Sequence, residues 1–357
     1  MSAADGRTPA AQGFAMPAEW ERHEATWLSF PHNAADWPGK FAPVPWAYAE
    51  IVRWAAEGEL VRLIVKDATH EKSARRVLER SGVALDRVQF LRWPTDRGWM
   101  RDTGPIWVTR PGGKAIARFR FDGWSKYPNW KKDVKLPERA AARLDAELLP
   151  ILHDGRPVVL EGGAIDVNGA GTLLTTEECL LDPAVQVRNP GFAREDYEVL
   201  FRDALGARNT VWLGRGIAGD DTHGHVDDLA RFVDARTIVL VREDDPKDAN
   251  YGPLEENRER LQGARLQDGS RPQLAYLPMP GPVVFDGQRL PASYANFYVA
   301  NAAVLVPTFD DPADREALGI LGELFKDRPV VGIHARDLVW GLGTIHCLSQ
   351  QEPAVPI

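Results

Sequence analysis

Residues 297–333 read FYVANAAVLVPTFDDPADREALGILGELFKDRPVVGI, and this stretch indicates the class of fold. Two apolar runs at 297–299 and 303–307 are rich in β-branched residues and predict strands. The segment from Asp311 to Phe325 predicts a helix, because an Asp-Pro pair opens it and leucines recur at helical spacing on one face. The run at 329–333 predicts a third strand. The whole stretch is therefore a strand, strand, helix, strand unit.

Comparable units precede this one along the chain. The first runs from about Glu24 to Trp93, is less regular and carries two helices, near Trp46–Ala56 and Glu71–Glu79. In each of the other three units, the sequence predicts a segment with two strands, then a helix, then a final strand. In this order, the ranges are Thr103–Phe121, Pro137–Leu149 and Pro157–Leu160 for the second unit; Ala164–Leu181, Arg194–Leu205 and Thr210–Leu213 for the third; and Leu229–Arg242, Leu254–Leu261 and Gln273–Leu277 for the fourth. The sequence therefore predicts an α/β fold of five repeated units.

Polar residues follow the final strand of every unit. The clusters are Asp96–Pro105, Glu161–Gly163, Asp220–Asp228, Ser293–Asn296 and Gly341–Pro353. Strands commonly end in glycine-rich turns, which is one sufficient explanation. The alternative is a radial assembly in which the strand ends meet at a central axis and build one pocket.

The composition is that of an ordinary globular chain, with 357 residues, 44% hydrophobic residues and a net charge of −8. No stretch approaches the ~20 apolar residues of a membrane helix, and residues 1–14, which lack the order of a secretory signal, predict a flexible tail. The excess of 51 acidic over 43 basic residues argues against nucleic-acid and anionic-membrane partners and tolerates a small cationic substrate. Two cysteines cannot form a disulfide framework, which favours a reducing cytoplasm.

Cys347 is the candidate nucleophile. It lies in GLGTIHCLSQQ (341–351), where glycines before it and polar residues after it predict a loop or strand end open to a ligand. A single cysteine is more often a small buried hydrophobe, and Cys179 is interpreted in that way. His346 would point to the opposite side of an extended chain from Cys347 and is also interpreted as structural.

His225 is the candidate base, within DTHGHVDD (221–228). In an extended segment His223, His225 and Asp227 would share one face. Two chemistries compete for this pattern: a metal site of the His-x-His-x-Asp type, and a general base beside a carboxylate that binds substrate. The remaining histidines form no second spaced pair, so the metal hypothesis lacks ligands.

Asp102 and Trp99 lie in TDRGWMRDTGP (95–105). Without a site, Asp102 would form a surface ion pair with Arg101, and Trp99 would be a core residue. In a pocket, a carboxylate and an indole suit a planar cation, because the carboxylate accepts paired N–H donors and the ring face attracts positive charge. Glu161, at the end of the strand before Gly162, is either the first solvated residue or the carboxylate that orients His225.

In these blocks, the chain resembles the agmatine deiminase and bacterial peptidylarginine deiminase family of the guanidine-modifying superfamily. The resemblance covers nearly the whole chain from Met16 and rests on blocks in order: WMRDTGP (99–105), LEGG (160–163), GTLLTTEECLL (171–181), GHVD (224–227) and IHC (345–347) onward. It implies a five-fold pseudo-symmetric α/β propeller of strand-strand-helix-strand units around a central active-site pocket. It also implies one catalytic domain over residues 15–357, with exposed faces compatible with a homodimer.

The resemblance implies a role for each matching residue. Cys347 matches the nucleophile, His225 the general acid and base, and Glu161 the glutamate paired with that histidine, while Asp102 and Asp227 match the carboxylates that grip the guanidinium and Trp99 matches a substrate-contacting aromatic residue. No metal and no organic cofactor are implied. The expected reaction is hydrolysis of agmatine to N-carbamoylputrescine and ammonia, within putrescine and polyamine metabolism.

Departures from the family pattern leave the far end of the substrate open. They fall at Asp96–Gly98, His223, Asp228 and Leu342. Arginine, a peptide ending in arginine and other alkylguanidines therefore stay beside agmatine as candidate substrates. An amidinotransferase, a metal-dependent hydrolase using His223, His225 and Asp227, and a non-catalytic guanidine-binding protein are the alternative functions.

Overall fold

The computed structural model describes residues 8–356. Of the predicted tail at 1–14, residues 1–7 lie outside the described residues. Residues 10–12 form a short 3₁₀ helix, and Phe14 is buried against the second hydrophobic cluster of the molecule.

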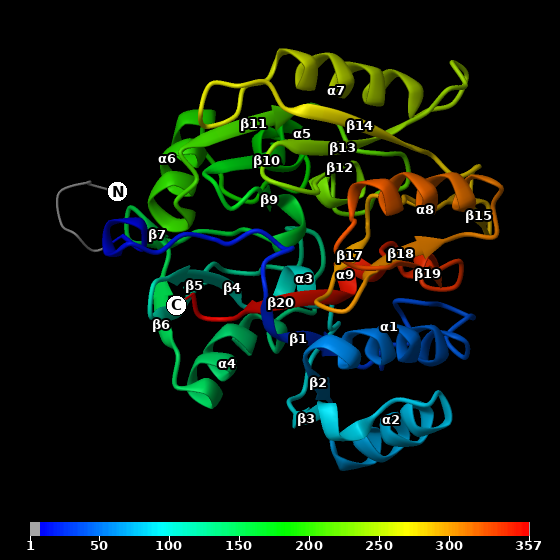
Figure 1. Ribbon diagram of the computed structural model, residues 1–357. Coiled ribbons are helices and arrows are strands. Elements are labelled where there is room, and N and C mark those ends of the chain that lie inside the picture. Colours follow the sequence, from blue (N-terminus) through cyan, green and yellow to red (C-terminus); the bar gives the residue numbers. More distant parts are fainter. Residues whose placement is uncertain (1–7, 357) are drawn as a thin grey trace.

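Within the described residues, five mixed sheets share one strand order (Figure 1). In each, a strand pairs antiparallel with a central strand, which pairs parallel with a strand reached through a helix. The sheets consist of β20 (Ser349–Pro353), β1 (His23–Ser29), β2 (Leu60–Val65) and β3 (Val88–Arg92); β4 (Ile106–Arg110), β5 (Gly113–Arg118) and β6 (Glu147–Pro150); β9 (Asp166–Val167), β10 (Thr172–Thr176) and β11 (Asn209–Leu213); β12 (Ala230–Phe232), β13 (Thr237–Arg242) and β14 (Gln273–Pro278); and β17 (Tyr298–Val299), β18 (Val304–Thr308) and β19 (Val330–His334). The α/β class and the repeated unit are confirmed.

The longer helices lie on the outside of the molecule, whereas the short helices α3 and α9 lie near its middle (Figure 1). The longer ones are α1 (Val44–Gly58), α2 (Ala68–Arg80), α4 (Leu136–Leu144), α6 (Arg194–Leu205), α7 (Tyr251–Gly263) and α8 (Ala313–Leu324). The shorter ones are α3 (Met100–Thr103), α5 (Glu177–Leu181) and α9 (Ile345–Leu348), and two small hairpins pair β7 (Leu152–His153) with β8 (Arg156–Pro157) and β15 (Val284–Phe285) with β16 (Gln288–Arg289). None of the described helices has the length and apolar character needed to cross a bilayer.

Local sequence signals set several helix ends. Asp67 caps α2, where its carboxylate accepts a hydrogen bond from the backbone N–H of His70 at 2.8 Å. Gly206 adopts a left-handed conformation (φ 71°) and ends α6 at the predicted boundary.

Two elements of the sequence prediction are wrong. The parallel strand of the second sheet is β6 (Glu147–Pro150) and not Pro157–Leu160, so the predicted helix also ends five residues early, at Leu144. The segment 158–160 makes only an isolated bridge, between Arg120 and Val159. Continuous apolar character marked 157–160 as a strand, but this character reflects burial near the site rather than strand pairing.

The first sheet contains a strand from the far end of the chain. β20 pairs antiparallel with β1. The expected polar turn at 341–353 therefore divides into a short helix, α9, that holds Cys347, and a fully buried strand that follows it. The polar residues of β20 bond to buried partners, which is why hydrophobicity gave no sign of a strand.

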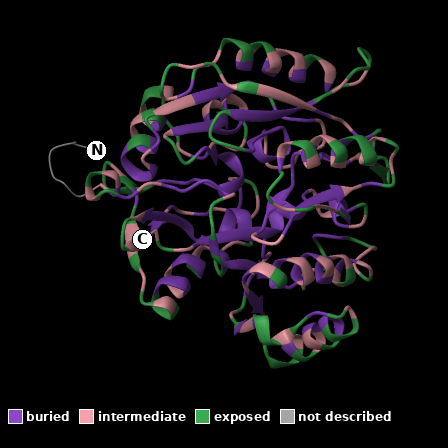
Figure 2. Ribbon diagram, viewed as in Figure 1, coloured by how far each residue is buried: buried purple, intermediate pink, exposed green. Residues whose placement is uncertain are grey.

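Glu352 links β20 to the first two sheets through buried charges. Its carboxylate accepts hydrogen bonds from Trp27 Nε1 at 2.8 Å, Arg62 Nε at 2.7 Å and Lys114 Nζ at 2.7 Å. The Glu352 side chain is 0% exposed, and most of the ribbon in the middle of the molecule is buried (Figure 2). Removing this carboxylate leaves the almost fully buried Arg62 with a half-exposed carboxylate, that of Glu24 at 3.6 Å, in place of a buried one at 2.7 Å.

We predict that Glu352→Ala lowers the free energy of unfolding by about 3–5 kcal/mol, as for other broken buried ion pairs. Glu24→Ala is the matched control, because Glu24 contacts the same Arg62 and Lys114 but is 50% exposed, and it should cost less than about 1 kcal/mol. Urea denaturation measures both changes. Equal losses in the two variants would contradict the assigned role of Glu352.

Candidate active site

The five polar clusters meet in the interior of the molecule. Each cluster contributes one or two residues. In chain order they are Asp102, Glu161, the pair His225 and Asp227, Asn296, and Cys347. The His225 ring nitrogens lie 3.8 Å from Asp102 Oδ1 and 3.8 Å from Glu161 Oε2. Cys347 Sγ lies 3.0 Å from Asn296 Nδ2 and 3.6 Å from Asp227 Oδ2. Side chains from all five polar clusters therefore lie within a few ångströms of one another.

Cys347 is fixed by the amide of Asn296. This amide donates a hydrogen bond to the sulfur, and its oxygen accepts from Thr344 Oγ1 at 2.7 Å and from the backbone N–H of His346 at 3.1 Å. Burial, and then the charges of Asp227, Asp228 and Asp102, raise the pKa of the Cys347 thiol well above its ordinary value. The site therefore holds a neutral thiol that needs a cation to ionise.

His225 is an almost fully buried imidazole with an unusual environment. Neither ring nitrogen has a hydrogen-bond partner among the described residues. Burial opposes the charged ring, but Asp102, Cys179 and Glu161 outweigh burial and hold the pKa of His225 well above its usual value. These neighbours therefore favour the charged form of the ring, and in that form both N–H groups are free to donate.

Glycine and arginine shape the surroundings of His225. A Cβ on Gly163 would lie 2.5 Å from His225 Nδ1, so the ring packs directly on this backbone. Arg188 Nε lies 3.2 Å from Glu161 Oε1. Burial raises the pKa of Glu161, but the opposing effect of Arg188 and His225 is larger and brings this pKa down to about 2. The carboxylate therefore stays ionised.

Asp102 and Asp227 differ in how their oxygens are bonded. Asp102 accepts from Trp124 Nε1 at 2.8 Å and from the backbone N–H of Gly163 at 3.0 Å. Burial, aided by the charges of Asp227 and Glu161, raises the pKa of Asp102 to about 6. Asp227 Oδ2 lies 2.7 Å from His346 Nδ1, whereas Oδ1 has no partner among the described residues.

A cavity of about 370 Å³ opens onto Cys347 and Asp102. Trp99 lines it and stacks on Trp37, with ring centroids 5.4 Å apart. A Cβ on Gly343 would approach Trp99 Cζ3 to 2.9 Å, so the glycine lets the indole pack against the loop before Cys347. A planar cation in this cavity would have a thiol, carboxylates and an aromatic face around it.

Comparison with known proteins gives a match over most of the chain. The family model described as Porphyromonas-type peptidyl-arginine deiminase matches residues 15–353. The chain belongs to this family. Among curated relatives, the agmatine deiminases of Ectopseudomonas mendocina (strain ymp) and Stutzerimonas stutzeri (strain A1501) are 33% and 35% identical, each covering 97% of both chains.

Solved structures show the same similarity as the sequences. The agmatine deiminase of Enterococcus faecalis superposes with a TM-score of 0.89 at 28% identity and covers 98% of both chains. That of C. jejuni has a TM-score of 0.83 at 28% identity and covers 96% of this chain and 97% of its own.

In this member of the peptidyl-arginine deiminase family, the structure gathers all six residues predicted for the site. These are Trp99, Asp102, Glu161, His225, Asp227 and Cys347. His223 is not among them: its Nε2 lies 2.9 Å from Asp182 Oδ2, and its backbone is left-handed (φ 67°). The alternation expected for 223–227 fails because Val226–Asp228 is a 3₁₀ turn rather than a strand.

Several residues of the site were missed by sequence reasoning. Asn296 and Asp228 lay in the polar clusters, which was the available signal. Trp124 comes from a loop outside the clusters, and Cys179 and His346 were interpreted as structural. His346 faces Asp227 because α9 is helical, so the alternation of an extended chain does not apply.

Two groups of described residues could hold a metal ion by proximity alone, and neither contains His223. They are Glu161 with Cys179 and His225, and Asp227 with Asp228 and Cys347. In the first group Arg188 already neutralises Glu161, and in the second His346 occupies Asp227 Oδ2. In each donor set, one carboxylate therefore already has a protein partner for an oxygen atom that a metal would need.

We predict that alkylation of Cys347 by iodoacetamide in the absence of substrate has a pH midpoint above the ordinary thiol value of 9.0. The neutral thiol is favoured below that midpoint, so the rate rises as the pH increases towards the midpoint and levels off above it. Stopped-time labelling with mass spectrometry measures the rate, and Cys347→Ser gives the contribution of Cys179. A midpoint at or below the ordinary value would contradict the raised pKa.

Proposed function

We propose that this protein hydrolyses the C–N bond of a small guanidine, with agmatine and water giving N-carbamoylputrescine and ammonia. The observation that carries the proposal is the position of Cys347 Sγ, between the Asn296 amide and Asp227 and beside a cavity that also contains Asp102 and Trp99. The family membership and the agmatine deiminases among the relatives support it.

The architecture we propose for residues 15–357 is a single catalytic domain, a five-fold pseudo-symmetric propeller around this cavity. Support comes from the common strand order of the five sheets and from the meeting of one polar cluster from each unit.

In the first half of the proposed reaction, the guanidinium binds with its N–H groups on Asp102 and Asp227 and its central carbon against Cys347. The added positive charge lowers the pKa of the thiol, which loses its proton to solvent. The thiolate attacks the central carbon and forms a C–S bond. His225, held as the imidazolium by Glu161 and Asp102, donates a proton to one amino group, which leaves as ammonia.

In the second half, the neutral His225 accepts a proton from water, and the resulting hydroxide attacks the carbon of the amidino thioether. The C–S bond then breaks and the thiolate leaves, which gives a ureido product. The ureido group is neutral, so Asp102 and Asp227 hold it less strongly than they hold the guanidinium.

We expect the outer part of the cavity to determine which group a substrate can carry beyond its guanidinium. Arg97 Nη2 pairs with Asp36 Oδ1 at 2.7 Å and stacks 4.0 Å from the Tyr127 ring centroid. Asp221 accepts from Tyr127 Oη at 2.6 Å and pairs with Lys126. These paired charges cancel locally, so arginine and guanidino acids belong in any substrate test beside agmatine.

We predict that the wild-type protein releases ammonia from agmatine and that Cys347→Ser does not. The assay compares agmatine, arginine, a peptide ending in arginine and guanidinobutyrate, each with and without EDTA. A chelator-insensitive, Cys347-dependent release is the expected result, because the nucleophile is a thiol. Turnover by Cys347→Ser at the wild-type rate would refute the mechanism, and amidino transfer to an added amine would favour an amidinotransferase.

We predict that kcat/KM for the guanidine falls as the pH decreases through about 6, the pKa to which burial raises Asp102. The protonated carboxyl cannot pair with the guanidinium, so the loss appears below that pH and is absent above it. Asp36 has a pKa of about 6 for the same cause, burial, and Asp36→Asn separates the two. The fall should persist in this variant, and its disappearance would reassign the titration to Asp36.

A further inference from the structure

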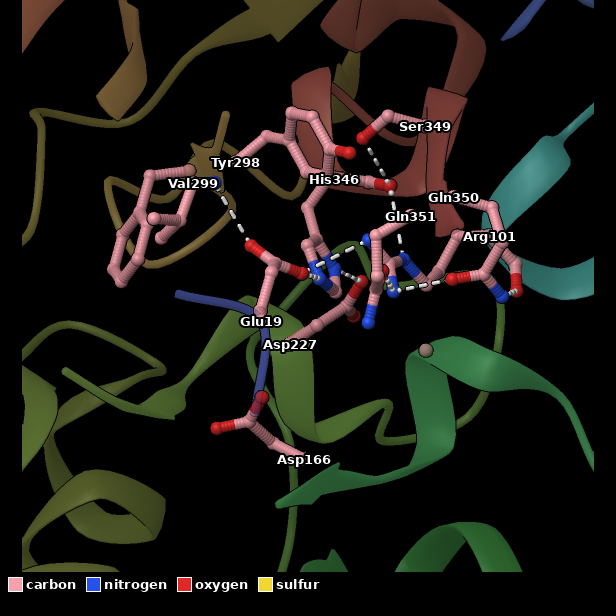
Figure 3. A network of polar contacts seen from close by, with 12 residues as sticks. Glu19, Arg101, Asp166, Asp227, Tyr298, Val299, His346, Ser349, Gln350 and Gln351 are labelled. Atoms are coloured by element: carbon pink, nitrogen blue, oxygen red, sulfur yellow. Dashed lines mark hydrogen bonds and ion pairs between the residues drawn. The ribbon is translucent and has the colours of Figure 1, made fainter. Parts of the chain in front are cut away.

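Asp227 belongs to a buried chain of three residues, which we call the Glu19–His346–Asp227 chain (Figure 3). His346 Nδ1 lies 2.7 Å from Asp227 Oδ2, and His346 Nε2 lies 2.8 Å from Glu19 Oε2. The side chains of all three are at most 5% exposed. Each ring nitrogen of His346 therefore lies within hydrogen-bond distance of a carboxylate oxygen, one on either side of the ring.

Glu19 is fixed in turn by two arginines. Its carboxylate lies 3.0 Å from Arg101 Nη2 and 3.0 Å from Arg231 Nη2, and it accepts from the backbone N–H of Val299 at 2.9 Å. Arg231 also pairs with Asp166. Three carboxylates, those of Glu19, Asp166 and Asp227, are thus joined to one another through two arginines and the His346 ring.

As a consequence, one carboxylate oxygen of Asp227 has a hydrogen-bond partner, and the other has none among the described residues. Oδ2 is held by His346, while Oδ1 is buried without a partner among the described residues. A carboxylate held at one oxygen cannot rotate freely, so Oδ1 keeps one direction. An N–H donor of the substrate would find this acceptor already oriented.

We propose that Glu19 and His346 are positioning residues of the reaction, which hold Asp227 so that its free oxygen receives the guanidinium. The inference rests on the proposed function for the identity of the substrate. It assigns a task to His346 that its neighbour Cys347 does not explain, and to Glu19, which is more than 200 residues away in sequence from both Asp227 and His346.

The test compares two reagents of nearly equal shape on Cys347. The thiolate displaces chloride from 2-chloroacetamidine, a cation, or from 2-chloroacetamide, which is neutral; in both cases a C–S bond forms and a C–Cl bond breaks. Only the amidinium needs Asp227, so the ratio of the two labelling rates reports the grip on the cation separately from the thiol. Mass spectrometry counts the label.

We expect His346→Gln and Glu19→Gln to lower this ratio about tenfold or more, as the loss of a charge-assisted hydrogen bond does. Asp227→Asn gives the reference for complete loss. Tyr298→Phe is the matched control: Tyr298 lies beside this chain in Figure 3, but its hydroxyl bonds Thr26 at 2.8 Å, so the ratio should stay unchanged. With agmatine, KM should rise more than kcat falls.

An unchanged ratio in His346→Gln and Glu19→Gln would overturn the proposal, as would equal losses with both reagents, which indicate damage to the thiol or the fold. Urea denaturation identifies a variant that fails to fold. Glu19→Gln, which keeps the size of the side chain, then carries the test. A wild-type protein that releases no ammonia but shows the expected ratios would refute the proposed function while leaving the positioning role intact.

Discussion

Like charges crowded around a buried thiol are the constraint on which the rest of this structure depends. Asp102, Asp227 and Asp228 all raise the pKa of Cys347, and burial raises it further. Burial and Asp227 also raise the pKa of Asp228 well above its ordinary value. Such a site is electrostatically incomplete, because its negative groups lack a cation at the point where they face one another. A guanidinium would supply that charge, which links binding to activation of the nucleophile.

Some of the carboxylates in this region are neutralised by arginines of the protein itself. Arg188 neutralises Glu161, and Arg101 and Arg231 neutralise Glu19. Glu161 and Glu19 therefore each pair with an arginine, whereas Asp102 has no arginine partner: it accepts hydrogen bonds from Trp124 and the backbone of Gly163 and lies 3.8 Å from the His225 ring. This division separates carboxylates that support the architecture from those left for a ligand.

The sequence predicted the α/β class, the repeated unit and six residues that lie together in the structure, three of which line the cavity, because strand ends and polar clusters are local patterns. The role of β20 was not predictable from pattern, since a strand of Ser, Gln and Glu becomes buried only by bonding to distant arginines. The misplaced strand at 157–160 shows the converse, as apolar residues can be buried without pairing. His346 and Trp124 were missed because their partners lie in other units, and periodicity carries no information on such contacts.

The pairing of β20 with β1 also determines when the protein can become complete. His23 pairs with Pro353, and the strand that makes this contact directly follows Cys347. A chain emerging from the ribosome can form the intervening sheets one after another, but its first sheet keeps an open edge until residue 353 is available. The nucleophile is thus delivered in the same late step that closes this edge, so partly synthesised chains hold the carboxylates without the thiol. Folding should be slow for this size, because its last contact spans almost the whole chain.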